Sequence, residues 1–571
     1  NNTNNNTNNN TNNNTNNNTN NNTNNNCNYN IKKHNEYSKQ PICITSKTSD
    51  PRNELKGILN YASVQVLKSL NLSYDHINSK EYFMALSLIC NQLAIHKFNH
   101  NDFWYILSNK LIDIFEVPYI CENFCIRWLA LILNSFGRIY FLNKKFMNKS
   151  ANFIKKYKTD DIHGFDISQI VNAYAKLNYV DYNLFEYMEN IIYKKLDQLN
   201  YQCISNICNA YSKFYGTNMP ISITMNNNHM HEQKHKTNAV YTKLFINLYS
   251  KVTNNLDKFN EQELANILNS YSKMGIKNYD LFNKSFEYVF IRFNNFKPIE
   301  IVMIANAYAK CNIYNKKFFN YLFTYIKKNA DLFEPPELAI LANAYANFNL
   351  RELKIFEIIK NKIYKKEHLL DTGNVAMLLH AFGKLLIRYE YFILNLIKKK
   401  KHVINNLDCR NLTLFYVSIM KLNINIPIDV YNNLKFNILK KIKKFTDLAL
   451  VSICYSSMFY LYFDIKLISS ILILLNKRKA SSRSFAHQIH VTLFVLQSIY
   501  DFYKFSLQFI ISLHQLLNRA YYYIEQSNYY DINKSAIQKR IAPFFANTGF
   551  IIQSEVPIGP FVVDFLLQKK R

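Results

Sequence analysis

An asparagine and a lysine four residues apart recur along the chain inside close copies of one heptapeptide. The copies read IVNAYAK at Ile170, ICNAYSK at Ile207, ILNSYSK at Ile267 and IANAYAK at Ile304, and a fifth copy, LANAYAN at Leu341, ends in asparagine instead of lysine. An amide both donates and accepts hydrogen bonds, and an ammonium group can neutralise a phosphate. A series of such pairs has the chemistry to hold a polyanion whose edges form hydrogen bonds.

Three positions of the repeat carry these candidate binding residues. The asparagine position is Asn172, Asn209, Asn269, Asn306 and Asn343, with His380 in the next unit. The closing lysine is Lys176, Lys213, Lys273, Lys310 and Lys384. The position three before the asparagine varies: Gln169, Asn206, Asn266, Met303, Ile340 and Met377.

The constant and the variable positions allow two interpretations. In the first, variable residues face successive bases of a single strand, while Asn and Lys hold base edges or phosphates, as in one-repeat-per-base recognition. In the second, the asparagines form a structural ladder between stacked helices, and Met and Ile simply pack. On a helical wheel, Asn266, Asn269, Ser270 and Lys273 are expected opposite the apolar arc.

A constant spacing organises these heptapeptides into repeats. Successive closing positions are 37 residues apart from Lys176 to Lys213 and at each step from Lys273 to Lys421. The step from Lys213 to Lys273 is 60 residues, so a polar insertion at about 217–238 is predicted to loop out of one repeat.

Each repeat reads as two helices. After Glu261, residues Leu264, Ile267, Leu268 and Tyr271 form one apolar stripe at helical spacing, and Gly275 then separates them from a second periodic segment. Two short helices cannot bury their stripes alone, so the units must stack. The predicted fold is all-α: an α-solenoid of helical hairpins over about 80–510. The equivalent tyrosines Tyr174, Tyr271, Tyr308 and Tyr345 should share one environment.

Both ends of the chain differ from the repeats. Residues 1–40 include a tract of NNTN units that has nothing to bury, which predicts disorder. The chain starts without Met and stops in FVVDFLLQKKR, so we expect a fragment at both ends, with any targeting segment outside it.

The formal charge of +29 favours a polyanionic partner, nucleic acid before an anionic membrane. Part of the lysine content could instead reflect an AT-rich coding sequence. Lysine runs at Lys398 and Lys440 are either solvated helix faces or phosphate contacts. The ten cysteines lack zinc spacing and read as reduced core residues of an intracellular protein. No metal or cofactor is expected, and no apolar run is long enough to span a membrane.

The period and the (I/L)xNAYAK helix resemble the heptatricopeptide and octotricopeptide repeats, relatives of the pentatricopeptide repeats that bind organellar RNA. The resemblance covers most of residues 160–425. It implies single-stranded RNA as a partner, bound by the columns of asparagines, lysines and variable residues named above.

The last residues of the chain resemble the start of a RAP domain, which would occupy 534–571 and be truncated. Prolines and glycines concentrate after Pro543, and two strand-like runs follow, Ile551 to Val556 and Phe561 to Leu567. The matching positions are Gly549, Glu555, Gly559 and Val563-Asp564-Phe565. RAP domains resemble small α/β endonuclease-like folds.

Repeats followed by a RAP domain resemble apicomplexan (Plasmodium-like) mitochondrial proteins that act on organellar RNA. The combination implies a mitochondrial protein that binds ribosomal or messenger RNA for processing, stabilisation or ribosome assembly, with ribosomal or RNA-processing proteins as further partners. It is not expected to be an enzyme. Two alternatives remain: a protein-binding scaffold or mitoribosome subunit, and a metal-dependent RNA nuclease that uses Asp564.

Overall fold

The computed structural model describes residues 51–71, 79–117, 124–218, 243–400, 403–457, 464–480, 482, 485–499, 506–525, 541, 543–544, 550–558 and 561–569. Two compact units are Asn1–Ile58 and Leu59–Arg571, and in the first only residues 51–58 are described, at the start of α1 (Pro51–Leu70). The expected insertion at about 217–238 lies almost wholly outside the described residues, and residues 1–40 lie outside them entirely.

The repeats are helical hairpins, as predicted, and the all-α repeat fold is confirmed. We call the helix that carries the heptapeptide or its counterpart the first helix. First helices are α3 (Lys80–Ile95), α6 (Ile126–Ile139), α8 (Gly164–Lys176), α10 (Tyr201–Asn218), α12 (Glu261–Lys273), α14 (Pro298–Cys311), α16 (Pro335–Asn347), α18 (Thr372–Leu385), α21 (Cys409–Leu422), α23 (Asp447–Ser457) and α25 (Ala486–Ile499).

The second helix of each hairpin follows a short turn. Second helices are α4 (Asn101–Phe115), α7 (Lys144–Ile154), α9 (Tyr182–Lys194), 243–253, α13 (Tyr279–Ile291), α15 (Lys316–Asn329), α17 (Leu353–Lys365), α19 (Glu390–Lys399), α22 (Ile428–Lys441), α24 (Ile465–Lys477) and α26 (Leu507–Glu525). The four-residue helix α20 (Val403–Asn406) follows α19. Short 3-10 turns lead back to the next first helix at Thr159–Asp161, Leu196–Gln198, Leu256–Lys258, Phe293–Asn295, Ala330–Leu332, Glu367–Leu369 and Ile442–Lys444.

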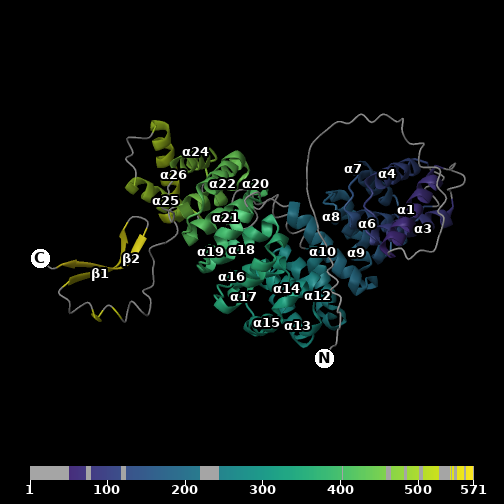
Figure 1. The fold of residues 1–571 in the computed structure, drawn as a ribbon, viewed down its shortest axis with the longest axis horizontal. Coiled ribbons are helices and arrows are strands. Elements are labelled where there is room, and N and C mark those ends of the chain that lie inside the picture. The colour runs from purple at the N-terminus through teal and green to yellow at the C-terminus, as the bar shows by residue number, and fades with distance from the viewer. Residues whose placement is uncertain are drawn as a thin grey trace, which may run out of the picture. The chain divides into compact units, whose positions relative to one another are not determined.

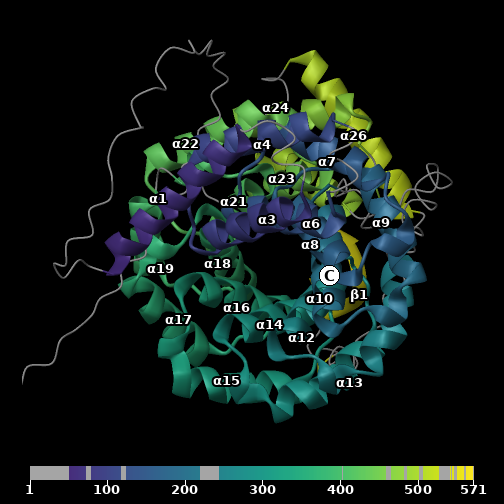
Figure 2. The same ribbon diagram turned by 90° about the vertical axis from the view of Figure 1, so that its right-hand side faces the viewer.

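Each first helix packs against the next one along the chain, from α3 and α6 through to α23 and α25 (Figure 1). Figure 2 shows α12, α14, α16 and α18 in one layer and α13, α15 and α17 in another. Among the described residues, no helix has the length and apolar character needed to cross a bilayer.

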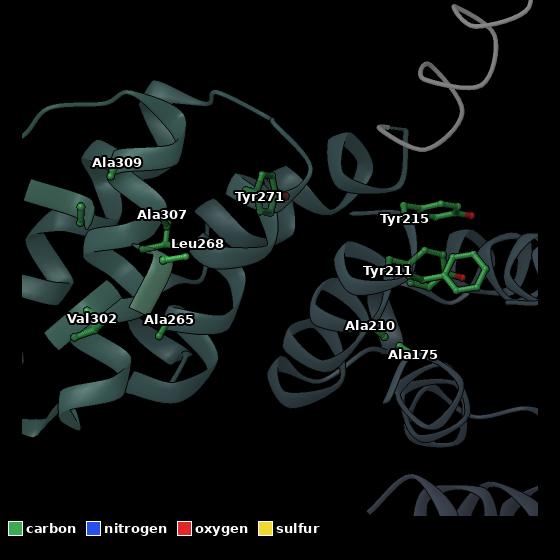
Figure 3. Close-up of a cluster of buried hydrophobic side chains, with 14 of the residues drawn as sticks. Ala175, Ala210, Tyr211, Tyr215, Ala265, Leu268, Tyr271, Val302, Ala307 and Ala309 are labelled. Atoms are coloured by element: carbon green, nitrogen blue, oxygen red, sulfur yellow. The ribbon is translucent and has the colours of Figure 1, made fainter. Parts of the chain in front are cut away.

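Small residues in the heptapeptide let first helices approach one another closely. A Cβ on Gly137 would lie 3.0 Å from Cα of Ala173 in the next first helix, and one on Gly383 would lie 2.9 Å from Cα of Ser418. The alanines on either side of the tyrosine occupy these two contact positions in other repeats. Figure 3 shows such a pair, Ala175 facing Ala210. The NAYAK sequence is therefore a packing motif as well as a candidate binding motif.

The tyrosine between these alanines fastens each first helix to the preceding second helix. Its hydroxyl donates to a backbone carbonyl 26 residues earlier: Tyr211 to Phe185 at 2.8 Å, Tyr271 to Phe245 at 2.8 Å and Tyr308 to Phe282 at 2.8 Å. Tyr174 donates likewise to Met147 at 2.6 Å. All of these rings are buried, as is that of Tyr345, so the predicted common position is confirmed. The hydroxyl of Tyr345 differs from those of these four tyrosines: it forms no hydrogen bond with any described group.

Turn and cap residues recur with the same period. Two residues after the closing position, the backbone is left-handed at Asn312 and Asn349, and at Gly275 with φ of 70°. This conformation is strained for most side chains but not for glycine, and Asn tolerates it. Three residues later, Asn278 and Asn315 cap their second helices by accepting from the backbone N–H groups of Leu281 and Phe318.

The two strands predicted near the C-terminus form an antiparallel hairpin, β1 (Phe550–Ile558) with β2 (Phe561–Lys569). Val556 pairs with Val563, and Ser554 pairs with Phe565. Asp564 is exposed on β2. This is the strand order of the expected RAP start, but two strands alone are too common to identify that domain.

Candidate nucleic-acid interface

Each regular first helix presents one partly exposed row of four positions, which we call the first-helix stripe. The row consists of the closing position and the residues 11, 7 and 4 positions before it. This spacing keeps all four on one face of the helix. On α12 the stripe is Gln262, Asn266, Asn269 and Lys273. On α21 it is Arg410, Leu414, Val417 and Lys421. The variable position, the asparagine position and the closing position of the repeat therefore lie along a single face of each first helix.

The structure places every predicted binding residue in these stripes. Half-buried side chains are those of Gln169, Asn172, Lys176, Asn206, Asn209, Lys213, Asn266, Asn306 and Asn343. Exposed ones are Lys273, Lys310 and Lys384. Asn269 is buried, with 7% of its surface exposed, so the expectation that it lies opposite the apolar arc was wrong. The expectation for Ser270 was wrong. It is fully buried, and its hydroxyl donates to the Asn266 carbonyl at 2.6 Å, because its position turns toward the neighbouring first helix.

The closing positions form a column of like charges. We call Arg138, Lys176, Lys213, Lys273, Lys310, Lys384 and Lys421 the cation column. Although the Lys273 side chain as a whole is exposed, desolvation by the surrounding helices lowers its pKa, and repulsion from Lys310 and Lys213 lowers it further. The pKa of Lys176 is lowered by burial and then by Arg138 and Lys213. Consecutive members from Arg138 to Lys310 are therefore close enough to repel one another, and an anion bound between them would relieve that repulsion.

Six of the seven side chains in this column form no ion pair among the described residues. Within the part of the chain that the structure describes, no ion pair involves Arg138, Lys176, Lys273, Lys310, Lys384 or Lys421. Most ion pairs involve second helices or turns, for example Lys366 with Glu334 at 3.2 Å and Arg292 with Glu261 at 3.7 Å. An exception joins two first helices, Arg127 of α6 with Asp166 of α8 at 4.0 Å. The positive charge of these six closing positions is therefore not neutralised by a described carboxylate.

Cations at the ends of the second helices have a structural role that we did not predict. Lys400, in the first lysine run, donates to the carbonyl of Leu370 at 3.0 Å, and Lys441, in the second run, donates to that of Leu407 at 2.6 Å. Lys195 and Arg292 make the same kind of contact with Ile162 and Phe259. Each of these cations donates a hydrogen bond to a backbone carbonyl of the turn that leads into the first helix of its own hairpin. A signal existed: Lys195 and Arg292 each lie 19 residues after a closing lysine.

One amide contact matches the structural-ladder interpretation. Asn343 Oδ1 lies 3.1 Å from Nδ1 of His380 on the next first helix. Burial, followed by repulsion from Lys384, Lys421 and Arg410, lowers the pKa of His380 to about 4. The imidazole is therefore neutral at pH 7 and adds no charge to the column.

The variable position changes character along the stack. It is polar on α8, α10 and α12 (Gln169, Asn206, Asn266) and apolar on α14, α16 and α18 (Met303, Ile340, Met377). All six side chains are half-buried, so each retains surface that a ligand could contact.

Sequence comparison connects this helical stack to a known family. The family model of the RNA-editing substrate-binding complex 6 protein, RESC6, matches residues 233–531, which is more than half of the chain. The chain belongs to this family. No match was found among curated proteins. A solved-structure comparison gives a chain of the "Homology model of the full-length AP-3 complex in an intermediate open conformation", with 12% identity, a TM-score of 0.24, and coverage of 83% of this chain and 94% of that one. A TM-score this low does not establish a shared fold.

The family match contains only part of the cation column. First helices α12 to α21, with Lys273, Lys310, Lys384 and Lys421, lie within it. Helices α8 and α10 precede it, although they carry the same heptapeptide, and the β1–β2 hairpin follows it. The RAP resemblance thus draws no support from this match.

Proposed function

We propose that the chain binds single-stranded RNA along its first-helix stripes. The observation that carries the proposal is the cation column: a lysine or arginine closes the seven first helices α6, α8, α10, α12, α14, α18 and α21, and six of these side chains form no ion pair among the described residues. Each cation can neutralise one phosphate and release its counterion. The name of the family, an RNA-editing substrate-binding complex protein, supports RNA as the polyanion.

Single-stranded RNA suits the stripe better than a duplex. The hairpins that begin with α8, α10, α12 and α14 each offer one cation, one amide and one variable side chain. Unstacked bases expose edges that such side chains can contact. In a duplex those edges are paired, and recognition depends mainly on backbone shape. Asn206 and Asn266 can form hydrogen bonds with bases, whereas Met303 and Ile340 can only pack against them.

We further propose that this binding serves mitochondrial RNA, ribosomal or messenger, in processing, stabilisation or ribosome assembly, without catalysis by the chain itself. The repeat and RAP resemblances motivate the location. Membership of a complex-associated family supports protein partners as well as RNA.

A protein-binding scaffold is the second candidate, favoured by exposed apolar side chains on the second helices. Ile291 is 80% exposed, Tyr391 78% and Phe436 62%. Large exposed apolar residues are typical anchors of protein interfaces. They belong to the other helix layer, so a protein partner there and RNA on the stripes are compatible.

Salt dependence tests the proposed function. A fluorescent single-stranded RNA of about 20 nucleotides should bind the purified chain with a plot of log affinity against log salt whose slope is about −3 to −5, if five to seven phosphates are neutralised. A duplex of the same length should bind more weakly. Fluorescence anisotropy at several salt concentrations measures both. Absence of binding, or affinity independent of salt, would contradict the proposal.

A further inference from the structure

A pocket opens beside second helix α15, against α16 and the turn that leads from α16 to α17. Its volume is about 350 Å³, within the range of small-ligand sites. Aromatic walls are formed by Tyr314, Phe319 and Phe323, and Asn320 and Glu352 add polar groups. Tyr314 and Phe319 stack at 5.8 Å between ring centroids, so the walls support one another.

The buried tyrosine of α16 lines this pocket and breaks the pattern of the repeats. Tyr345 is 1% exposed, and among the described residues nothing forms a hydrogen bond with its hydroxyl. In the preceding repeat the equivalent hydroxyl, that of Tyr308, donates to Phe282 at 2.8 Å. A buried hydroxyl without a partner is costly, which is a reason to expect a ligand group beside it.

The carboxylate of Glu352 is a second departure at the same place. Its position corresponds to Asn278 and Asn315, which cap their second helices, but Glu352 makes no such cap with α17. Within the described ranges it also forms no ion pair. Burial raises the pKa of Tyr345, and the negative charge of Glu352 raises it further, so the two groups lie near one another. One pocket therefore holds an uncommitted carboxylate and an uncommitted hydroxyl.

The α16 repeat also interrupts the cation column. Its closing residue is Asn347 instead of lysine. This position is next to the pocket, because Leu350, three residues later, is one of the lining residues. Arg351 and Lys354 flank Glu352 in sequence and are exposed. These cations disfavour a positively charged ligand and favour one that is attached to phosphates.

The pocket chemistry fits a planar base with adjacent N–H donors. A base can stack between aromatic side chains, and a carboxylate accepts from two neighbouring N–H groups. Guanine offers such a pair on its Watson–Crick edge, at N1 and N2. Uracil has a single N–H between two carbonyl oxygens, which a carboxylate repels. We propose that this pocket binds a guanine base of the RNA strand held by the cation column, an inference that rests on the proposed function.

Two RNAs test the pocket separately from the column. Oligouridine of about 20 nucleotides reports on the column, and the same strand with one central guanosine reports on both. For the unmodified chain we expect the guanosine to tighten binding about tenfold, the effect of one good base-edge contact. Glu352→Gln should abolish this gain and leave oligouridine affinity unchanged. The matched control Glu287→Gln, an exposed carboxylate on α13, should retain the gain.

The outcomes separate the two proposals. Oligouridine binding without a guanosine gain, or a gain that persists in Glu352→Gln, overturns the pocket alone. Failure of both RNAs to bind overturns the proposed function. Binding of N-acetylarginine amide that depends on Glu352, without binding of guanosine monophosphate, would assign the pocket to a protein side chain instead. Tyr345→Phe should weaken the guanosine gain with an unchanged melting temperature, which excludes misfolding as the cause.

Discussion

Replacing Lys273 and Lys310 together with glutamine should weaken binding of single-stranded RNA about tenfold or more, whatever its sequence. The two ammonium groups are neighbours in the cation column and have no acidic partners among the described residues. Each lost phosphate contact should reduce the salt slope by roughly 0.7, so the double variant should lose about 1.4. Anisotropy titrations at several salt concentrations measure both quantities.

The matched control replaces two lysines of a second helix and leaves the same net charge. Lys327 and Lys328 are exposed near the end of α15. Lys327→Gln with Lys328→Gln should change the salt slope much less than the stripe variant does. Equal losses for both variants would mean that overall charge, and not the first-helix stripe, governs binding. Loss of a protein partner with unchanged RNA affinity would favour the scaffold.

Gly383→Val should destabilise the helical stack by about 3 kcal/mol. A Cβ at Gly383 would lie 2.9 Å from both Cα and Cβ of Ser418, so α18 and α21 would have to move apart. Overpacking of this kind typically costs about 1–3 kcal/mol, and valine adds two further methyl groups. Thermal melting followed by circular dichroism measures the loss.

Gly373→Ala, on the same helix, is the control: it shows the effect of replacing a helical glycine where the new side chain has room. A Cβ there would meet its nearest neighbour at 3.5 Å, which is ordinary van der Waals contact. Stability should stay the same or rise slightly, because alanine favours helix more than glycine does. If Gly383→Val melts like the unmodified chain, the close approach of α18 and α21 is wrong.

The fold was predictable because its information is local and repeated. The spacing of Leu264, Ile267, Leu268 and Tyr271 indicates a helix, and the 37-residue period indicates stacking. Neither signal depends on contacts between distant residues. The shared burial of the tyrosines followed from the same period, since each repeat solves the same packing problem.

The detailed roles of side chains were less predictable. A helical wheel assigned Ser270 to the ligand side, but a first helix packs on two neighbours as well as on its second helix, so only a narrow stripe stays accessible. Lys400 read as part of a charge run, whereas it donates to a carbonyl 30 residues away. The departure at Tyr345 is invisible in sequence, because the residue itself is the expected tyrosine.

Crosslinking with 4-thiouridine RNA, followed by mass spectrometry of the crosslinked peptides, tests most directly whether RNA lies on the first-helix stripes. Crosslinks are expected on peptides from α8, α10, α12, α14, α18 and α21, and they should decrease when Lys273 and Lys310 are replaced. Crosslinks confined to second helices such as α13, α15 and α22, and unaffected by those replacements, would contradict the stripe as the RNA-binding face.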